Sequence, residues 1–467
     1  MRYAPIVFGR LVDRLNKGFI MIKKEKNRKF NLKIKSKDID PGALFIIKKL
    51  NDRGYEALVV GGCIRNLVMG EEAHDWDITT SATPKEISRA FKDYKVVPVG
   101  EKYGTIMVVI KAVNYQVTTF RGKDKLKGRE ETEVAKWTSL LLEDLKHRDF
   151  TINALAWGEK EGVLDYFKGL EDIKRRVIKG VEDPSERIKE DPLRMLRAIR
   201  MACELDFKID QATLQVIKKN SLLIKKVSPE RIRDELIKIL LSNFPKRGFK
   251  LLQQLGLLQF ILPELERCVD FYQEDLCPNK DLFEHILNLL NNLPPDLALR
   301  LVALLGEITH PPSNSQTSRE EVAAKILRRL KFKNSIIKKV SILVQEDWRA
   351  IDFLNPKNIR QFISKRGEEN ILNVLELKRA EIKIGKKIAK LKQLEKMEQQ
   401  VREVLEEKPA VSLKALAING KDLIDLGYQE GVELGRMLKK LLEIVIDKPE
   451  LNRRERLLEF LETGLMK

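Results

Sequence analysis

The sequence predicts an α+β protein in which a small region of mixed strands and helices precedes a longer, nearly all-helical region. Short β-rich runs separated by Gly and Asn occur up to about residue 175. From Pro184 onward apolar residues recur at i, i+3 and i+4, which is the helical period. The length of 467 residues exceeds one compact core, so we expect about two to four domains.

The composition favours a polyanionic partner. The chain carries 88 Lys and Arg against 69 Asp and Glu, a formal net charge of +19, and nucleic acid is the first candidate for such a surplus. A lysine-rich surface that serves solubility or heat tolerance is the alternative, and composition leaves both open. Lys and Arg greatly outnumber the acids over residues 1–37, which predicts a basic N-terminal extension over residues 1–40.

The apolar runs and the cysteines predict a cytoplasmic protein that does not bind a membrane. No run of about 18 apolar residues occurs, and the start of the chain lacks the apolar segment of a secretion signal. The cysteines form no C-x-x-C pair and no regular framework, so we expect free thiols in a reducing compartment. They are Cys63, Cys203, Cys268 and Cys277.

The first region is expected to alternate helices and strands. Residues 41–56 resemble a short amphipathic helix, and the apolar run 57–60 predicts a strand that enters a tight turn at Gly-Gly. Residues 76–80 predict a second strand, and Pro84 opens a helix over residues 84–92. Further β-rich runs are expected at Val96–Val99, Thr105–Ile110 and Gln116–Phe120.

The second region is expected to consist of helices separated by prolines. Breaks are predicted near 243–247, 263, 294–295, 311–312 and 409. The Lys- and Glu-rich segment 382–407 predicts one long solvated helix with i, i+4 pairs rather than a coiled-coil dimer. His310–Ser318 is expected to form a loop.

The most informative segment joins a Gly-Gly turn to a pair of carboxylates. Gly61 and Gly62 allow positive φ and a close backbone approach to phosphate, and Arg65 can pair with a phosphate. Asp75 and Asp77 are spaced i, i+2, so on an extended chain they point the same way and can hold Mg²⁺. Such a pair equips a chain for nucleotidyl transfer, in which one ion activates a 3′-hydroxyl and another neutralises the β- and γ-phosphates.

Two further groups of residues combine Arg with Asp. Arg148 and Asp149 open the run that ends in Asn153-Ala154, and the pair could be a structural salt bridge or could hold ribose and triphosphate. Asp191 and Arg194 lie i, i+3, which on one helix places an acceptor and a fork donor on the same face. That pair could read the edge of a base, or it could be a surface ion pair.

Taken together, the motifs resemble the class II tRNA nucleotidyltransferase and bacterial poly(A) polymerase family, most of all its longer CCA-adding members. The resemblance covers roughly residues 45–467. The ordered matches are GG-x-x-R with D-x-D, R-D-F-T-x-N-A, D-x-x-x-G-x-x-D at Asp165, Gly169 and Asp172, E-D-P-x-R-x-x-R-A-x-R, and a helix with Glu230, Arg231, Ile232, Glu235 and Lys238.

The resemblance implies template-free addition of C, C and A to the 3′ end of tRNA from CTP and ATP with Mg²⁺. It implies that Asp75 and Asp77 are the catalytic metal ligands. The nucleotide-binding residues would be Gly61, Gly62, Arg65, Arg148, Asp149, Asn153, Asp191, Arg194, Arg197 and Arg200. Asp191 and Arg194 would form the protein template that selects C and then A.

The implied fold is a polymerase-β-like head followed by an all-α neck, body and tail in a seahorse arrangement. The expected division is a basic extension over 1–40, the catalytic head over 41–178, the neck over 179–243, a helical body over 244–350, and a tRNA-binding tail over 351–467. The body around His285 resembles an HD phosphohydrolase in which Gly306-Glu307 replaces His-Asp, so we expect a helical scaffold without that activity.

Four departures from the family pattern keep neighbouring functions open. Asn66 stands where Asp is usual in the family, and His147 stands where Arg is usual. Gln116 leaves the identity of a third carboxylate in doubt, and the residues of the loop 122–137 differ from the family's usual sequence. A CC-adding, A-adding or poly(A) enzyme, and an RNA-binding protein with a weak site, therefore remain alternatives. The sequence also leaves monomer and homodimer open.

Overall fold

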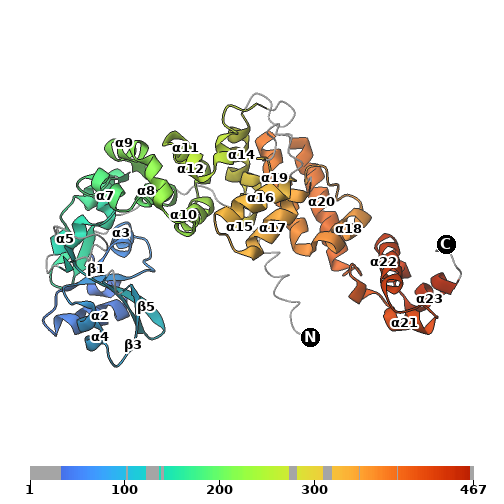
Figure 1. Ribbon diagram of the computed structural model, residues 1–467, viewed down its shortest axis with the longest axis horizontal. Helices are drawn as coiled ribbons and strands as arrows, with labels where there is room; N and C mark the ends of the chain where they lie inside the picture. The colour runs from blue at the N-terminus through green and yellow to red at the C-terminus, as the bar shows by residue number, and fades with distance from the viewer. Residues whose placement is uncertain are drawn as a thin grey trace. The chain divides into compact units, whose positions relative to one another are not determined.

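The computed structural model describes residues 33–100, 104–122, 136–137, 141–272, 281–308, 318–346, 348–385 and 388–462 (Figure 1). It divides into two compact units, the first ending at Ile261 and the second beginning at Leu262. Most of the basic extension, Cys277, the loop predicted from His310 and the middle of the loop 122–137 lie outside the described residues. The five-part division stays a prediction.

A mixed seven-stranded sheet forms the centre of the first unit, in the order β3-β4-β5-β2-β1-β8-β9. β2 and β5 are parallel, and the other neighbouring pairs are antiparallel. The strands are β1 (Ala57–Val60), β2 (Asp77–Thr80), β3 (Lys95–Gly100), β4 (Thr105–Ile110), β5 (Val113–Thr119), β8 (Leu155–Gly158) and β9 (Gly162–Asp165).

The predicted strands are confirmed in place, with shifted ends. β1 and β4 have the predicted bounds, whereas β2 begins one residue later and β5 three residues earlier. The first helix, α2, ends at Asn51 instead of residue 56, because the chain turns at Gly54 with φ +84°. The hairpin of β8 and β9 is an addition that the sequence analysis did not specify.

The register of the sheet brings the Gly-Gly turn and Asp77 together, whereas Asp75 is exposed and precedes β2. Val60 pairs with Asp77, and Asp77 pairs with Gln116 on the parallel neighbour. The chain leaves β1 at Gly61 directly beside the first residue of β2. The strand pairing therefore places Gly61, Asp77 and Gln116 next to one another.

Helices bury the sheet from both faces. α2 packs against β1 and β2 and buries Ile46, Ile47 and Leu50, while α4 packs against β4 and β5. On the other face α5 completes a core that is formed by Leu58, Val60, Phe120, Leu141, Leu145 and Ala156. Because β1 is buried at all four positions, its near-continuous apolar run is explained by coverage on both faces.

The rest of the first unit is helical and carries two short strand pairs. The pairs are β6 (Arg121–Gly122) with β7 (Lys136–Trp137), and β10 (Val177–Ile178) with β11 (Lys208–Ile209). α8 packs against α10 and α11. The helices are α2 (Pro41–Asn51), α3 (Gly62–Val68), α4 (Pro84–Ala90), α5 (Leu141–Lys146), α6 (Gly169–Arg175), α7 (Pro184–Glu190), α8 (Arg194–Leu205), α9 (Gln211–Lys219), α10 (Pro229–Leu241), α11 (Pro245–Gln254) and α12 (Leu258–Ile261).

The described residues of the second unit form helices and short turns, as predicted. The helices are α13 (Pro263–Glu266), α14 (Leu282–Asn292), α15 (Leu297–Leu305), α16 (Arg319–Arg329), α17 (Asn334–Gln345), α18 (Pro356–Arg366), α19 (Glu368–Gly385), α20 (Ile388–Glu406), α21 (Gly420–Asp425), α22 (Val432–Asp447) and α23 (Arg454–Glu462).

The single solvated helix expected over 382–407 is wrong in two respects. α19 ends at Gly385, and a separate α20 begins at Ile388. α20 buries Leu394, Met397, Val401 and Val404, and it packs against α18 and α19. These residues are spaced by 3, 4 and 3 positions, so they form an apolar stripe along one face of the helix. The overall composition of the segment does not reveal the stripe, because Lys and Glu are so numerous.

The HD-like part of the second unit carries a buried ion-pair network. Arg349 Nη1 donates to Glu307 Oε1 at 2.6 Å, and its Nη2 lies 3.5 Å from Glu381 Oε2. His285 Nε2 lies 3.6 Å from the same Glu381 oxygen. His285 and Glu307 are both 3% exposed, so a guanidinium lies among the side chains that the HD resemblance would assign to a metal.

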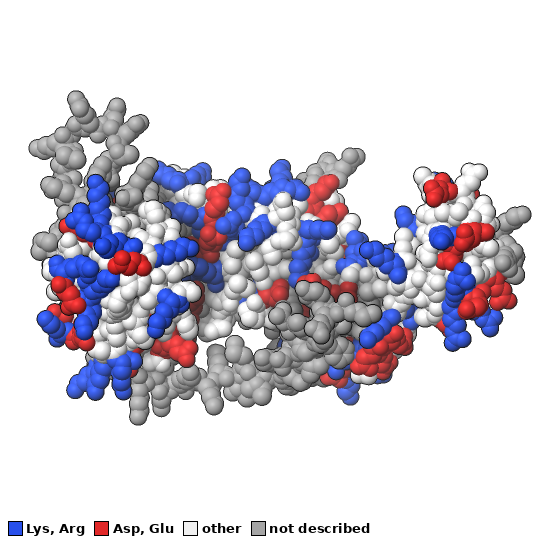
Figure 2. Space-filling view, turned by 90° about the horizontal axis from the view of Figure 1, so that it is seen from below, with Lys and Arg blue, Asp and Glu red and all other residues white. Residues whose placement is uncertain are grey.

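The surface of the described residues carries charges of both signs. On the face shown in Figure 2, Lys and Arg occur on both units with Asp and Glu between them. Among the described helices, none combines the length and apolar character that a membrane span requires.

Candidate active site

Gly61 lies at the centre of the candidate site, next to Arg148 and Asp77. It has φ +90° and precedes α3, and its N–H donates to Leu155 O at 3.0 Å. A Cβ at Gly61 would lie 2.9 Å from Arg148 Nη1 and 3.8 Å from Asp77 Oδ2. Only glycine therefore allows both this backbone conformation and the approach of Arg148 to the carboxylate.

The paired carboxylates suit a hard cation. Burial raises the pKa of Asp77, Arg148 opposes that rise, and the neighbouring Asp75 adds to it. A carboxylate whose charge is disfavoured by burial and by a neighbouring carboxylate is a fitting oxygen donor for Mg²⁺. Among the described residues no group of three or more His, Cys, Asp or Glu is placed to hold a metal.

Arg65 is held by two amides. Its Nη1 donates to Asn153 Oδ1 at 2.6 Å, and its Nε and Nη2 donate to Asn66 Oδ1 at 3.1 and 2.8 Å. Burial lowers the pKa of this guanidinium. Asn66 thus supplies a neutral acceptor where an Asp is usual, and the charge of Arg65 is balanced by Asp149 and other nearby carboxylates rather than by its hydrogen-bond partners.

Asp149 is an anchor at the centre of the first unit. Its Oδ1 accepts from Phe150 N at 2.8 Å and Asn153 Nδ2 at 3.0 Å, and its Oδ2 accepts from Arg197 Nε at 2.8 Å. Burial would raise the pKa of Asp149, but Arg197 and these hydrogen bonds lower it to about 2. Arg65, Asn153, Asp149 and Arg197 therefore form one continuous chain of contacts from α3 to α8.

Asp144 is a residue of this cluster that the sequence analysis missed. It is 5% exposed, and its Oδ2 accepts from Thr79 Oγ1 at 2.9 Å and lies 3.9 Å from Arg148 Nη2. Thr79 follows Asp77 at i, i+2 on β2, so it shares the face of that carboxylate. The i, i+4 spacing of Asp144 and Arg148 indicates an ion pair on a helix. Only the burial of Asp144 distinguishes this pair from an ordinary surface ion pair, and burial cannot be read from the spacing.

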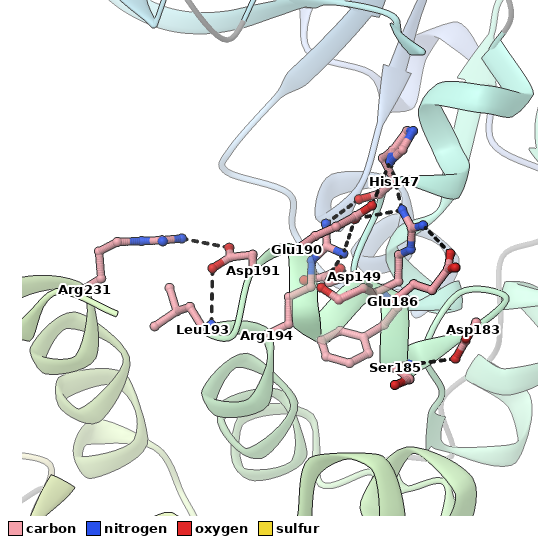
Figure 3. Close-up of polar contacts among 12 residues, drawn as sticks. His147, Asp149, Asp183, Ser185, Glu186, Glu190, Asp191, Leu193, Arg194 and Arg231 are labelled. Atoms are coloured by element: carbon pink, nitrogen blue, oxygen red, sulfur yellow. Dashed lines mark hydrogen bonds and ion pairs between the residues drawn. The ribbon is translucent and has the colours of Figure 1, made fainter. Parts of the chain in front are cut away.

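Asp191 and Arg194 do not share one helix, which corrects the sequence-based expectation. α7 ends at Glu190, Asp191 is extended with φ −141° and ψ 96°, and α8 begins at Arg194. The reason is Pro192, because a residue before proline avoids the helical conformation. In Figure 3 the Asp191 side chain points toward Arg231 and the Arg194 side chain toward His147.

Backbone carbonyls hold Arg194 in place. Its Nη2 donates to His147 O at 2.5 Å and its Nη1 donates to Arg187 O at 3.0 Å. The His147 ring contributes a different contact, because its Nδ1 lies 2.8 Å from Arg187 Nη1. His147 thus positions Arg194 through its backbone, an interaction that does not depend on the Arg usual at this position.

Two further predicted residues, Arg200 on α8 and Gln116 on β5, lie near the site. Arg200 Nε lies 2.7 Å from Glu235 Oε2, and its Nη1 lies 3.1 Å from Glu204 Oε2. Glu235 also lies 4.0 Å from Arg197 Nη1, so Arg200 is linked to the Asp149 cluster through Glu235 and Arg197. Gln116 is exposed and in register with Asp77, and its side chain is an uncharged amide.

Family models match three parts of the chain. Residues 57–179 match a poly A polymerase head domain, residues 206–268 match a probable RNA- and SrmB-binding site of polymerase A, and residues 315–461 match a putative tRNA nucleotidyltransferase domain 2.

Relatives are similar along most of the chain. The CCA-adding enzyme of Limosilactobacillus reuteri (strain DSM 20016) is 34% identical over 89% of this chain and 95% of its own length. That of Ligilactobacillus salivarius (strain UCC118) is 32% identical over the same shares. The crystal structure of the Bacillus stearothermophilus CCA-adding enzyme in complex with CTP has a TM-score of 0.72 at 28% identity, covering 91% of this chain and 98% of that one.

The fold is also similar in a more distant structure. The Thermotoga maritima CCA-adding enzyme complexed with tRNA has a TM-score of 0.58 at 21% identity, covering 91% of this chain and 96% of that one. The identity and coverage of the two lactobacillar relatives, together with the matched head and tRNA nucleotidyltransferase models, show that this chain is an enzyme of the CCA-adding family of tRNA nucleotidyltransferases.

Proposed function

We propose that this enzyme adds C, C and A to the 3′ end of tRNA from CTP and ATP, without a nucleic-acid template. The observation that carries the proposal is the cluster around Gly61, in which the Arg148 guanidinium and the Asp77 carboxylate both lie against a glycine turn that has no side chain. This is the combination that binding a triphosphate next to a metal-holding carboxylate requires.

The side chains of the cluster divide the chemistry between them. Asp75 and Asp77 would hold Mg²⁺, which supplies activation of the 3′-hydroxyl and charge neutralisation on the triphosphate. Arg148 and Arg65 would bind phosphate oxygens, since guanidinium groups match their geometry. Asp149 would act mainly as the anchor of Arg197 and Asn153, because its two oxygens already accept several hydrogen bonds.

Asp191 and Arg194 would select the nucleotide. A carboxylate accepts from the exocyclic amine of C or A, and a guanidinium donates to ring nitrogen or carbonyl oxygen. Arg194 is already oriented by His147 O and Arg187 O, so it would meet the base at little ordering cost. The CTP complex of the B. stearothermophilus relative supports CTP as a substrate.

A tRNA transcript ending at the discriminator base provides the test. It is incubated with CTP, ATP and Mg²⁺, and products are read at single-nucleotide resolution. Addition of three nucleotides followed by a stop is expected. Addition that stops at two, that requires a tRNA ending in CC, or that runs on as an A ladder would overturn it in favour of a CC-adding, A-adding or poly(A) enzyme.

Asp75→Ala and Asp77→Ala test the metal assignment separately. Each is expected to abolish incorporation while tRNA binding persists and weakens steeply with salt, because phosphate contacts release counterions. Retained incorporation in either variant would remove that carboxylate from the metal site. A wild-type chain that binds tRNA but incorporates nothing would instead indicate an RNA-binding protein.

We further propose that the enzyme works in the cytoplasm as a monomer or homodimer. The described cysteines Cys63, Cys203 and Cys268 are free and buried, which suits a reducing compartment. Light scattering on the purified chain would distinguish the two assemblies.

A further inference from the structure

Both oxygens of the Asp191 carboxylate accept hydrogen bonds, one from its own turn and one from a distant helix. Oδ1 accepts from Leu193 N at 3.2 Å, and Oδ2 accepts from Arg231 Nη2 at 2.8 Å. Arg231 reaches this carboxylate from α10, whereas Asp191 lies between α7 and α8 (Figure 3). The carboxylate is thus fixed between a backbone N–H of its own turn and a side chain 40 positions along the chain.

This support matters because Asp191 lacks the constraint of a helix. The backbone of Asp191 is extended, and its side chain is about a third exposed. With the Leu193 N–H as its only partner, the carboxylate group could rotate and Oδ2 would have no fixed position. The Arg231 side chain is 53% exposed, and such an exposed ion pair contributes little to folding stability. The main effect of the Arg231–Asp191 ion pair is therefore to fix the orientation of the Asp191 carboxylate.

We infer that Arg231 is a positioning residue for nucleotide selection, which acts by orienting the Asp191 carboxylate toward the base. An ionised carboxylate offers about four lone-pair sites, and the two contacts described leave sites free for the exocyclic amine of C or A. A uracil or guanine presents a carbonyl oxygen at that edge, which an oriented carboxylate repels. A carboxylate that rotates freely would lose much of this discrimination.

The inference rests on the proposed function, because it assigns Asp191 to base selection. The test measures kcat and KM for single additions of CTP, ATP, UTP and GTP to tRNA by wild type, Arg231→Ala and Arg231→Lys. Arg233→Ala is the matched control, since Arg233 lies on the same helix and pairs with its neighbour Asp234 at 2.7 Å.

Arg231→Ala is expected to lower the ratio of kcat/KM for CTP to that for UTP by about 10-fold, because one base contact loses its orientation. Most of the change is expected as a higher KM for CTP. Arg231→Lys is expected to recover part of the ratio, since it restores the charge without the planar fork. Arg233→Ala is expected to keep the wild-type ratio.

A double-mutant cycle with Asp191→Ala separates orientation from general damage. In the Asp191→Ala background, Arg231→Ala is expected to change the CTP to UTP ratio no further. An independent effect in that background, or a wild-type ratio in Arg231→Ala alone, would overturn the role of Arg231 while leaving CCA addition intact. A wild-type chain that adds no nucleotide would instead overturn the proposed function, and the assignment of Arg231 with it.

Discussion

Arg197 donates to Asp149 Oδ2 through both Nε and Nη2, at 2.8 and 2.6 Å, and so ties helix α8 to the R-D-F-T run that precedes strand β8. Asp149 is 9% exposed, whereas the Arg197 side chain is 34% exposed, so the carboxylate is the buried member of the pair. Since Arg197 lies three residues after Arg194 on α8, the pair also sets the position of the helix that carries the nucleotide-selecting arginine.

Asp149→Asn is expected to destabilise the chain by about 2 kcal/mol at pH 7, because a native pKa of about 2 lies well below the unfolded value. A carboxyl whose folded pKa is depressed contributes stability above its unfolded pKa of about 4, and that contribution is lost as the pH falls toward 2. The gap between the thermal midpoints of wild type and variant should therefore close over this range.

Asp183→Asn is the control for that experiment. Asp183 caps α7 through Ser185 N, and Asn caps a helix about as well as Asp. Its midpoint should follow the wild type across the pH range. Parallel curves for wild type and Asp149→Asn would contradict the role given to the Asp149 charge.

Gly61→Ala is expected to reduce nucleotide addition at least 10-fold, because the new methyl group lies 2.9 Å from Arg148 Nη1 and displaces it from Asp77. Gly54→Ala is the matched control: Gly54 has a similar φ of +84° but nothing within 4 Å of the added Cβ. Gly54→Ala should lose about 1 kcal/mol of stability from backbone strain. Gly61→Ala should lose more, because φ +90° with ψ −140° is a conformation that essentially only glycine adopts. Equal activity in the two variants would show that crowding at Arg148 is unimportant.

The strands and the order of the motifs could be predicted from the sequence because both are local signals. Ala57–Val60 is an apolar run stopped by glycine, and the register of Val60 with Asp77 follows once β1 and β2 pair. The break at Asp191 was also readable, since Pro192 disfavours a helical residue before it. The i, i+3 spacing of Asp191 and Arg194 instead favours one helix, and that prediction is wrong.

Other parts of the site depend on contacts between distant segments. Asp144 meets Thr79 across 65 positions, and Arg231 meets Asp191 across 40, and no local pattern encodes either distance. The buried stripe of α20 is a different case. Its apolar spacing was present in the sequence, but the high charge of the segment favoured a solvated helix.

Asp77→Asn is expected to abolish stabilisation of the chain by Mg²⁺. Burial and the neighbouring Asp75 raise the pKa of Asp77, and a protonated carboxyl does not ligate a metal. In wild type, the rise in thermal midpoint on adding Mg²⁺ should therefore shrink as the pH falls through the raised pKa. An equal Mg²⁺ effect in Asp77→Asn would place the ion elsewhere.

Arg349→Met is expected to destabilise the second unit by about 3–5 kcal/mol, because it leaves the Glu307 carboxylate buried without the guanidinium that compensates it. Adding Glu307→Gln should recover much of the loss, since the neutral amide no longer carries a buried charge. Arg456→Met, which removes an exposed pair with Glu459, should change stability by less than about 0.5 kcal/mol. Thermal unfolding of the three variants measures these changes in stability. If Arg349→Met behaved like Arg456→Met, the network around His285 would contribute little, and the scaffold would depend on apolar packing alone.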